Sequence, residues 1–153
     1  MTPFSGIVWR IVFADLASDP LAPARAPEGR FHYDGQVAIY TSLSAEGAGV
    51  AIQRYLADDA RPRVIVPLAV NGAIVLDLRS SEPGVPPTSV IWQDDRAAGR
   101  RAPTWDISDA ARAKGAQGIL YASRSRPDLS HLVLLGTPAP GLLTQAAPGT
   151  RWP

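Results

Sequence analysis

The residues best suited to chemistry lie in one short loop. Residues 29–35 read GRFHYDG, so that two glycines bracket an arginine and several aromatic side chains. Glycines let a backbone approach a ligand closely, and a guanidinium fork binds phosphate oxygens through paired hydrogen bonds. The loop therefore favours a phosphate-bearing ligand held by Arg30. Taken alone, however, Arg30 and the earlier Arg10 are each more simply loop caps or partners of an acid such as Asp34.

Missing motifs exclude several classes of enzyme. The sequence contains no Walker phosphate loop, no G-x-G-x-x-G fingerprint, no nucleophile elbow and no H-E-x-x-H zinc motif. It has no cysteine and only two histidines, which excludes thiolate sites and leaves too few ligands for a histidine-based metal centre. We therefore expect no metal.

The charge balance gives no general affinity for polyanions. Fifteen basic side chains are matched by 14 acidic ones, for a net charge of +1, so we expect no direct nucleic-acid or membrane binding. Arg10 interrupts the apolar start, which no basic segment precedes, so a signal peptide is not indicated. No run of about 18 uncharged apolar residues is present to cross a bilayer. We expect a cytoplasmic protein.

Two strands and a loop are predicted in the first part of the chain. Residues 6–13 alternate at period two, which predicts a strand with Arg10 on the face opposite its apolar residues. Residues 14–34 are rich in Pro, Ala and Gly and predict a long loop, a kind of segment that is often functional. Residues 36–42 predict the second strand.

A helix is predicted after the second strand. Ser44 is typical of a helix N-cap, and the pattern that follows predicts a helix over residues 45–57. Ala48, Ala51 and Tyr55 share its inward face.

The remaining chain predicts a hairpin, a helix and two short strands. Asn71-Gly72 separates two apolar segments, 63–70 and 73–78, and is typical of a tight turn between antiparallel strands. The other predicted segments are irregular structure at 90–101, a helix at 103–114 that Gly115 ends, strands at 118–122 and 131–135, and a Pro/Gly-punctuated tail at 138–153. The order of elements favours an α+β domain over residues 1–137, with a mixed, largely antiparallel sheet flanked by a few helices.

Four separated motifs resemble those of the RES domain. The family's Gly-Arg-Trp-Asn-x-x-Gly loop appears as residues 29–35, and the following strand that ends Tyr-x-Ser appears at 40–42. Its early aromatic-Arg pair appears at 9–10, and its late Gly-Ile-x-Tyr-x-Ser-Arg segment at 118–124. The resemblance covers residues 8–136 with the motifs in the family's order.

The resemblance implies a toxin that uses NAD⁺ as its substrate. RES domains are toxins of toxin–antitoxin pairs, and their folds resemble ADP-ribosyltransferase toxins. In this sequence the resemblance makes Arg30 the residue that grips the dinucleotide, with Arg10 as a second candidate. It also implies a cognate antitoxin that blocks the cleft around Arg30 and Tyr40.

The other motif positions supply further candidates. Tyr40 is expected to stack on the nicotinamide or its ribose and to present its hydroxyl, and Ser123 is expected to assist there. Ser42 is a further candidate contact with the dinucleotide. His32 replaces the family's Asn and either hydrogen-bonds a ribose hydroxyl or caps the loop. His131 is expected at the surface.

The sequence departs from the family at the acid. RES domains carry a Glu on the helix 11 residues after the Tyr, where this chain has Ala51. Cleavage of the glycosidic bond builds positive charge on the ribose, which a carboxylate stabilises. Three explanations are possible: another acid has taken over the role of the Glu, the chain is a binding-only member of the family, or the Glu was deliberately replaced by Ala. We favour the third explanation. Glu46 lies about 140° around the helix from position 51 and is a poor substitute.

Three functions remain open at this point. We favour cleavage of NAD⁺ with transfer of ADP-ribose to a target protein. Phosphorolysis or hydrolysis of NAD⁺, which depletes the cellular pool, is the catalytic alternative. A non-catalytic NAD-binding or interaction module is the third, because the expected Glu is absent.

Overall fold

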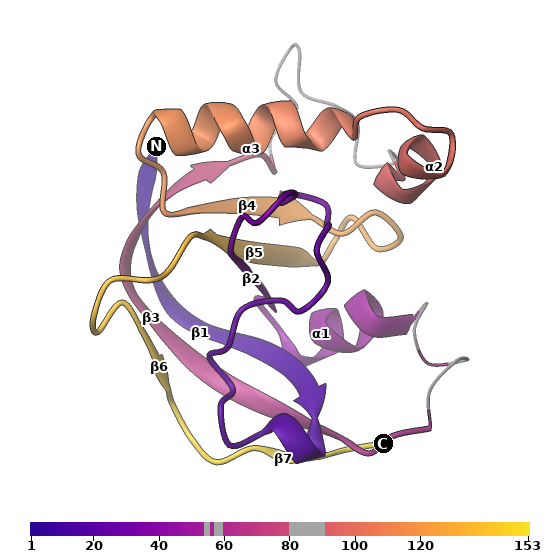
Figure 1. The fold of residues 1–153 in the computed structure, drawn as a ribbon. Coiled ribbons are helices and arrows are strands. Elements are labelled where there is room, and N and C mark those ends of the chain that lie inside the picture. Colours follow the sequence, from indigo (N-terminus) through magenta and orange to yellow (C-terminus); the bar gives the residue numbers. More distant parts are fainter. Residues whose placement is uncertain (54–55, 57–59, 80–90) are drawn as a thin grey trace.

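The computed structural model describes residues 1–53, 56, 60–79 and 91–153 (Figure 1). In chain order the elements are β1 (Thr2–Phe13), the 3₁₀ turn η1 (Ala14–Leu16), β2 (Ala38–Ser42), α1 (Ala45–Ile52), β3 (Arg63–Asp77), α2 (Trp92–Ala97), α3 (Pro103–Ala113), β4 (Gly118–Ala122), β5 (Ser130–Leu135), β6 (Leu143–Gln145) and β7 (Thr150–Trp152). No helix among these residues is long and apolar enough to cross a membrane.

The strands pair in a closed circuit. Figure 1 shows β1 and β3 as long curved strands side by side, and they pair antiparallel along their lengths. The other edge of β3 carries β7, β6 and β4 in turn, and the β3–β4 pair is parallel. From β4 the pairing continues through β5 to β2, which returns to β1 at Trp9 and Ser42. The expected α+β class with a mixed, largely antiparallel sheet is confirmed.

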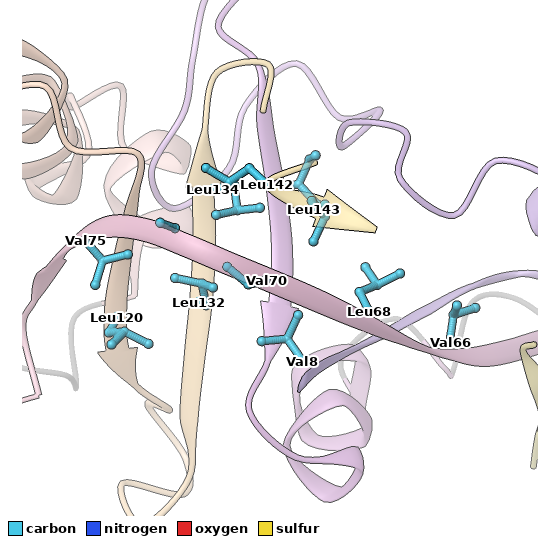
Figure 2. Packing of buried hydrophobic residues seen from close by; sticks show 12 residues of the cluster. Val8, Val66, Leu68, Val70, Val75, Leu120, Leu132, Leu134, Leu142 and Leu143 are labelled. Atoms are coloured by element: carbon cyan, nitrogen blue, oxygen red, sulfur yellow. The ribbon is translucent and has the colours of Figure 1, made fainter. Parts of the chain in front are cut away.

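The main core lies between β1 with β3 on one side and β2, β4 and β5 on the other. Side chains in strands alternate between faces, so Leu132 and Leu134 of β5 point into this core with Leu120 of β4. Val8 and Leu68 belong to the same cluster and are fully buried, and Figure 2 shows Val8 near Leu132 within it.

The opposite face of β2, β4 and β5 packs against α3. Ile119 and Val133 meet Ala111 of α3 there, and Phe31 joins them from the long loop. Helix α3 has Pro103 in its first turn, where a missing N–H costs nothing, and ends as predicted before Gly115, whose φ is 83°. This second face carries the candidate site at one end.

The predicted hairpin is wrong. Asn71 and Gly72 lie inside the single strand β3, because β1 supplies a partner for both halves. Ser5 of β1 faces two residues there, which is a β-bulge, and Gly72 takes the left-handed φ of 71°. The Gly72 N–H donates to Ser5 Oγ at 2.8 Å. Asn-Gly therefore marks a bulge and not a chain reversal.

Two helices differ from their predicted extents. Residues 92–97 form α2 inside the segment expected to be irregular, with Asp94 and Asp95 in the first turn, where the helix dipole favours negative charge. Helix α1 ends at Ile52, and Tyr55 of the longer predicted helix lies outside the described residues.

The segment 138–153, expected as a tail, contains two strands. Strands β6 and β7 pair antiparallel with β3, and Leu142 and Leu143 are buried in the main core. Trp152 of β7 lies against α1, since a Cβ built on Gly49 would be 3.5 Å from its ring.

Candidate functional site

One cavity of about 530 Å³ collects the residues expected to form the site. This volume lies within the usual range for small-molecule pockets. Its lining includes every position that the sequence singled out, namely Arg10, Arg30, His32, Tyr40, Ser42, Ala51 and Ser123. Residues of α1, the segment 91–93 and the late-motif turn complete the walls.

Strand alternation brings several of these side chains to one face. Ser42 of β2 is opposite His131 of β5 in the register, and His131 is in turn opposite Tyr121 of β4. Tyr40 and Ser123 lie two residues along their chains from Ser42 and Tyr121, so all five share the face that borders the cavity.

The loop is held by a chain of hydrogen bonds through His32 and Tyr40. The His32 Nε2 lies 2.8 Å from the carbonyl oxygen of Ala26, which only accepts, so Nε2 carries the proton. The Nδ1 then accepts from the Tyr40 hydroxyl at 2.8 Å, and that oxygen accepts from the Phe31 N–H at 2.9 Å. Burial raises the pKa of Tyr40, so the hydroxyl stays protonated. Both groups are thus engaged in holding the loop.

This chain of bonds requires glycine at position 29. A Cβ on Gly29 would lie 2.4 Å from the His32 ring and 2.6 Å from the Tyr40 hydroxyl oxygen. Such distances are far inside van der Waals contact, so any side chain at Gly29 displaces the pair. The glycine that the motif offers is therefore needed for close approach within the protein.

Helix α3 fixes the backbone of the same loop from the other side. The Trp105 indole N–H donates to the Gly29 carbonyl at 2.8 Å, and the Thr104 hydroxyl donates to the Arg30 carbonyl. Arg112 donates to the Phe31 carbonyl at 3.0 Å. Three successive carbonyls are thus satisfied by α3. These anchors could not be predicted from the sequence, because no local pattern shows which distant carbonyls a helix residue reaches.

Trp105→Phe tests the anchoring. It leaves the buried Gly29 carbonyl without its donor, so we expect the free energy of unfolding to fall by about 1 to 3 kcal/mol. Urea denaturation measures this. Trp152→Phe is the matched control, because the Trp152 indole makes no hydrogen bond with the described residues, and a loss as large in the control would contradict the anchoring role.

Arg30 has no counter-charge among the residues that the structure describes. Its guanidinium carbon lies 5.1 Å from the centre of the Tyr121 ring and 5.6 Å from that of Phe31. The buried Nε has no hydrogen-bond partner among the described residues, and the same residues give Arg30 no ion pair, with Asp34 or any other acid. Burial of part of the side chain lowers the pKa of Arg30, and even a partly buried cation is costly when no acid pairs with it. The site therefore favours an anion.

Comparison with known proteins identifies the family. The RES domain family model matches residues 7–153. The chain belongs to the RES domain family. The fold is similar to that of a chain in the crystal structure of the M. tuberculosis MbcT–MbcA toxin–antitoxin complex, with a TM-score of 0.69 and 19% sequence identity over 99% of this chain and 86% of that one. A search of curated proteins found no match.

Position 51 of this RES domain faces the cavity. The expected inward orientation is wrong in detail, because Gly47 and Ala48 are the buried residues of α1, whereas Ala51 is exposed on the wall of the cavity. Ser123, at the RES late motif, is 4% exposed, and its hydroxyl accepts from the Arg126 N–H at 3.3 Å.

Positive charge dominates the cavity of the RES domain. Arg10 and Arg124 line it together with Arg30, and Arg10 also donates to the Pro20 carbonyl at 2.8 Å. Among the described lining residues the one carboxylate is Glu28, which pairs with Arg96 of α2 at 2.9 Å. The described wall thus offers cations to a ligand and no unpaired acid.

His131 was wrongly expected at the surface. It is 6% exposed, because the register places it between Ser42 and Tyr121 in the middle of the sheet. Its Nδ1 lies 2.7 Å from the Ser42 hydroxyl oxygen. The hydrophilic type and the position beside a strand suggested exposure, and only the strand order shows that the ring is covered.

Proposed function

We propose that this RES domain is the toxin of a toxin–antitoxin system and that its cavity binds NAD⁺. The observation that carries the proposal is the half-buried Arg30, whose buried Nε has no partner among the described residues and which shares one cavity with Tyr40 and position 51. An anionic pyrophosphate supplies the partner that this cation lacks. The rings of Tyr40 and Tyr121 give aromatic surface for the nicotinamide or its ribose.

The proposed reaction is cleavage of the nicotinamide–ribose bond. Arg30 and Arg10 hold the pyrophosphate, Tyr40 and Ser123 position the nicotinamide ribose, and an acid at position 51 stabilises the positive charge that develops on the sugar. Ala51 cannot do this. In an active form the ADP-ribose is transferred to a target protein, in the cytoplasm where the NAD⁺ pool is available.

Two alternatives concern the fate of NAD⁺. Phosphorolysis or hydrolysis differs from protein modification in where labelled ADP-ribose is recovered: on phosphate, free in solution or on protein. A binding-only module is favoured by one observation, that no unpaired carboxylate is found among the described lining residues. The variant Ala51→Glu, which restores the expected acid, distinguishes a binding-only module from an enzyme.

The proposed partner is an antitoxin that covers the cavity. The structure with a similar fold comes from a toxin–antitoxin complex. We expect a loop or tail of the partner to lie over Arg30 and Tyr40, so that it competes with NAD⁺. A complex that leaves this cavity open would contradict the expectation.

Isothermal titration with NAD⁺ tests the proposal directly. We expect one NAD⁺ per chain, without any added metal. The absence of saturable binding at millimolar NAD⁺, for protein that melts cooperatively, would contradict the proposed function.

A further inference from the structure

Ser42 and His131 form a buried polar pair that borders the cavity. They come from the end of β2 and the start of β5, are 3% and 6% exposed, and their side chains are joined at 2.7 Å. The His131 ring also lies 5.3 Å from the Tyr121 ring. The imidazole is therefore held in one orientation by the sheet.

The pair is uncharged and keeps one unused donor. Burial, with the nearby charge of Arg30, lowers the pKa of His131 to about 4, so the ring is neutral at pH 7. If Ser42 donates to Nδ1, the proton on Nε2 is left over; if Nδ1 donates to Ser42, the hydroxyl proton is left over. No hydrogen bond joins Nε2 to the described residues. In either tautomer one donor is available at the cavity wall.

The pair lies beside the wall that holds position 51. Ser42 comes two residues before Ser44, the N-cap of α1, and a Cβ built on Gly47 would lie 3.3 Å from the Ser42 Cβ. Ala48 and Ala51 of the same helix line the cavity. The unused donor is thus at the end where the proposed function puts the reacting ribose.

We propose that Ser42 and His131 form a binding subsite that donates a hydrogen bond to an uncharged oxygen on the nicotinamide riboside half of NAD⁺. The inference rests on the proposed function. A neutral donor suits a carboxamide or hydroxyl oxygen, whereas Arg30 supplies the positive charge that the pyrophosphate requires. The two halves of the dinucleotide are thereby recognised by different chemistry.

Titration of NAD⁺ and ADP into His131→Asn tests the subsite, because ADP lacks the nicotinamide riboside. The Asn amide stands where Nδ1 stands and keeps the contact with Ser42, but does not reach the place of Nε2. We expect NAD⁺ affinity to fall about three- to tenfold and ADP affinity to stay unchanged. His131→Gln, whose amide reaches the place of Nε2, is expected to recover most of the loss.

Four results overturn the inference. If His131→Asn loses as much affinity for ADP as for NAD⁺, the substitution distorts the cavity in general. If His131→Gln melts like the unaltered chain but does not recover NAD⁺ affinity, the donor role of His131 is excluded. Unchanged NAD⁺ affinity both in His131→Asn, which removes the Nε2 donor, and in Ser42→Ala, which removes the hydroxyl donor, overturns the subsite and leaves the proposed function standing. If the unaltered chain binds no NAD⁺, both fail together.

Discussion

Replacing Ala51 by Glu is expected to raise NAD⁺ consumption by about 10²- to 10³-fold, the usual effect of a group that stabilises transition-state charge. Ala51 lies exposed on the wall of the cavity, so a longer side chain can extend into the space without displacing the core. Position 51 is next to the last residue of α1, where the helix dipole disfavours a negative charge by about 0.3 to 1 kcal/mol. A small loss of stability should therefore accompany the gain.

Nicotinamide release by the purified protein and growth after induced expression measure this effect. Ala51→Gln is the matched control, because it adds the same volume without the charge. The explanation that an acid is missing predicts activity and growth arrest for Glu and neither for Gln. If the Glu variant folds but consumes no NAD⁺ and arrests no growth, the chain is a binding module and the catalytic proposal is lost.

Local patterns predicted the elements whose partners are near in sequence or generic. The strand at 118–122 and the helix begun by Pro103 and ended before Gly115 were found with their bounds almost unchanged, since capping and apolar runs are local signals. The hairpin predicted at Asn71-Gly72 was wrong because the structure of this dipeptide depends on its pairing with β1, about 65 residues earlier in the chain. A turn signal and a bulge signal are identical until the partner strand is known.

The candidate site could be predicted in its positions but not in its bonding. The motifs indicated Arg30, Tyr40 and position 51, and all three line one cavity. They did not show that the Tyr40 hydroxyl and both nitrogens of His32 are engaged in holding the loop. Nor did they show the anchors on α3, because hydrogen bonds across more than 70 residues leave no periodic trace in the sequence.

Replacing Arg30 by Met is expected to weaken NAD⁺ binding without weakening the fold. The variant removes a charge-assisted contact with the pyrophosphate, which is worth about 2 to 3 kcal/mol, or about 30- to 150-fold in Kd. Because the guanidinium has no counter-charge among the described residues, its removal also relieves the cost of burying an unpaired cation. The loss of the cation–π contact with the Tyr121 ring costs about 0.5 to 1 kcal/mol and partly offsets this gain in the free energy of unfolding.

A residue that serves only the fold behaves in the opposite way. It lowers the melting temperature when removed and changes ligand affinity only as far as the structure is lost. Titration with NAD⁺ and thermal melting of Arg30→Met therefore separate the two roles, and Arg151→Met, on exposed β7 away from the cavity, is the control. Equal NAD⁺ affinity in both variants would remove Arg30 from the site, and with it our explanation for the lack of an acid partner of Arg30 among the described residues.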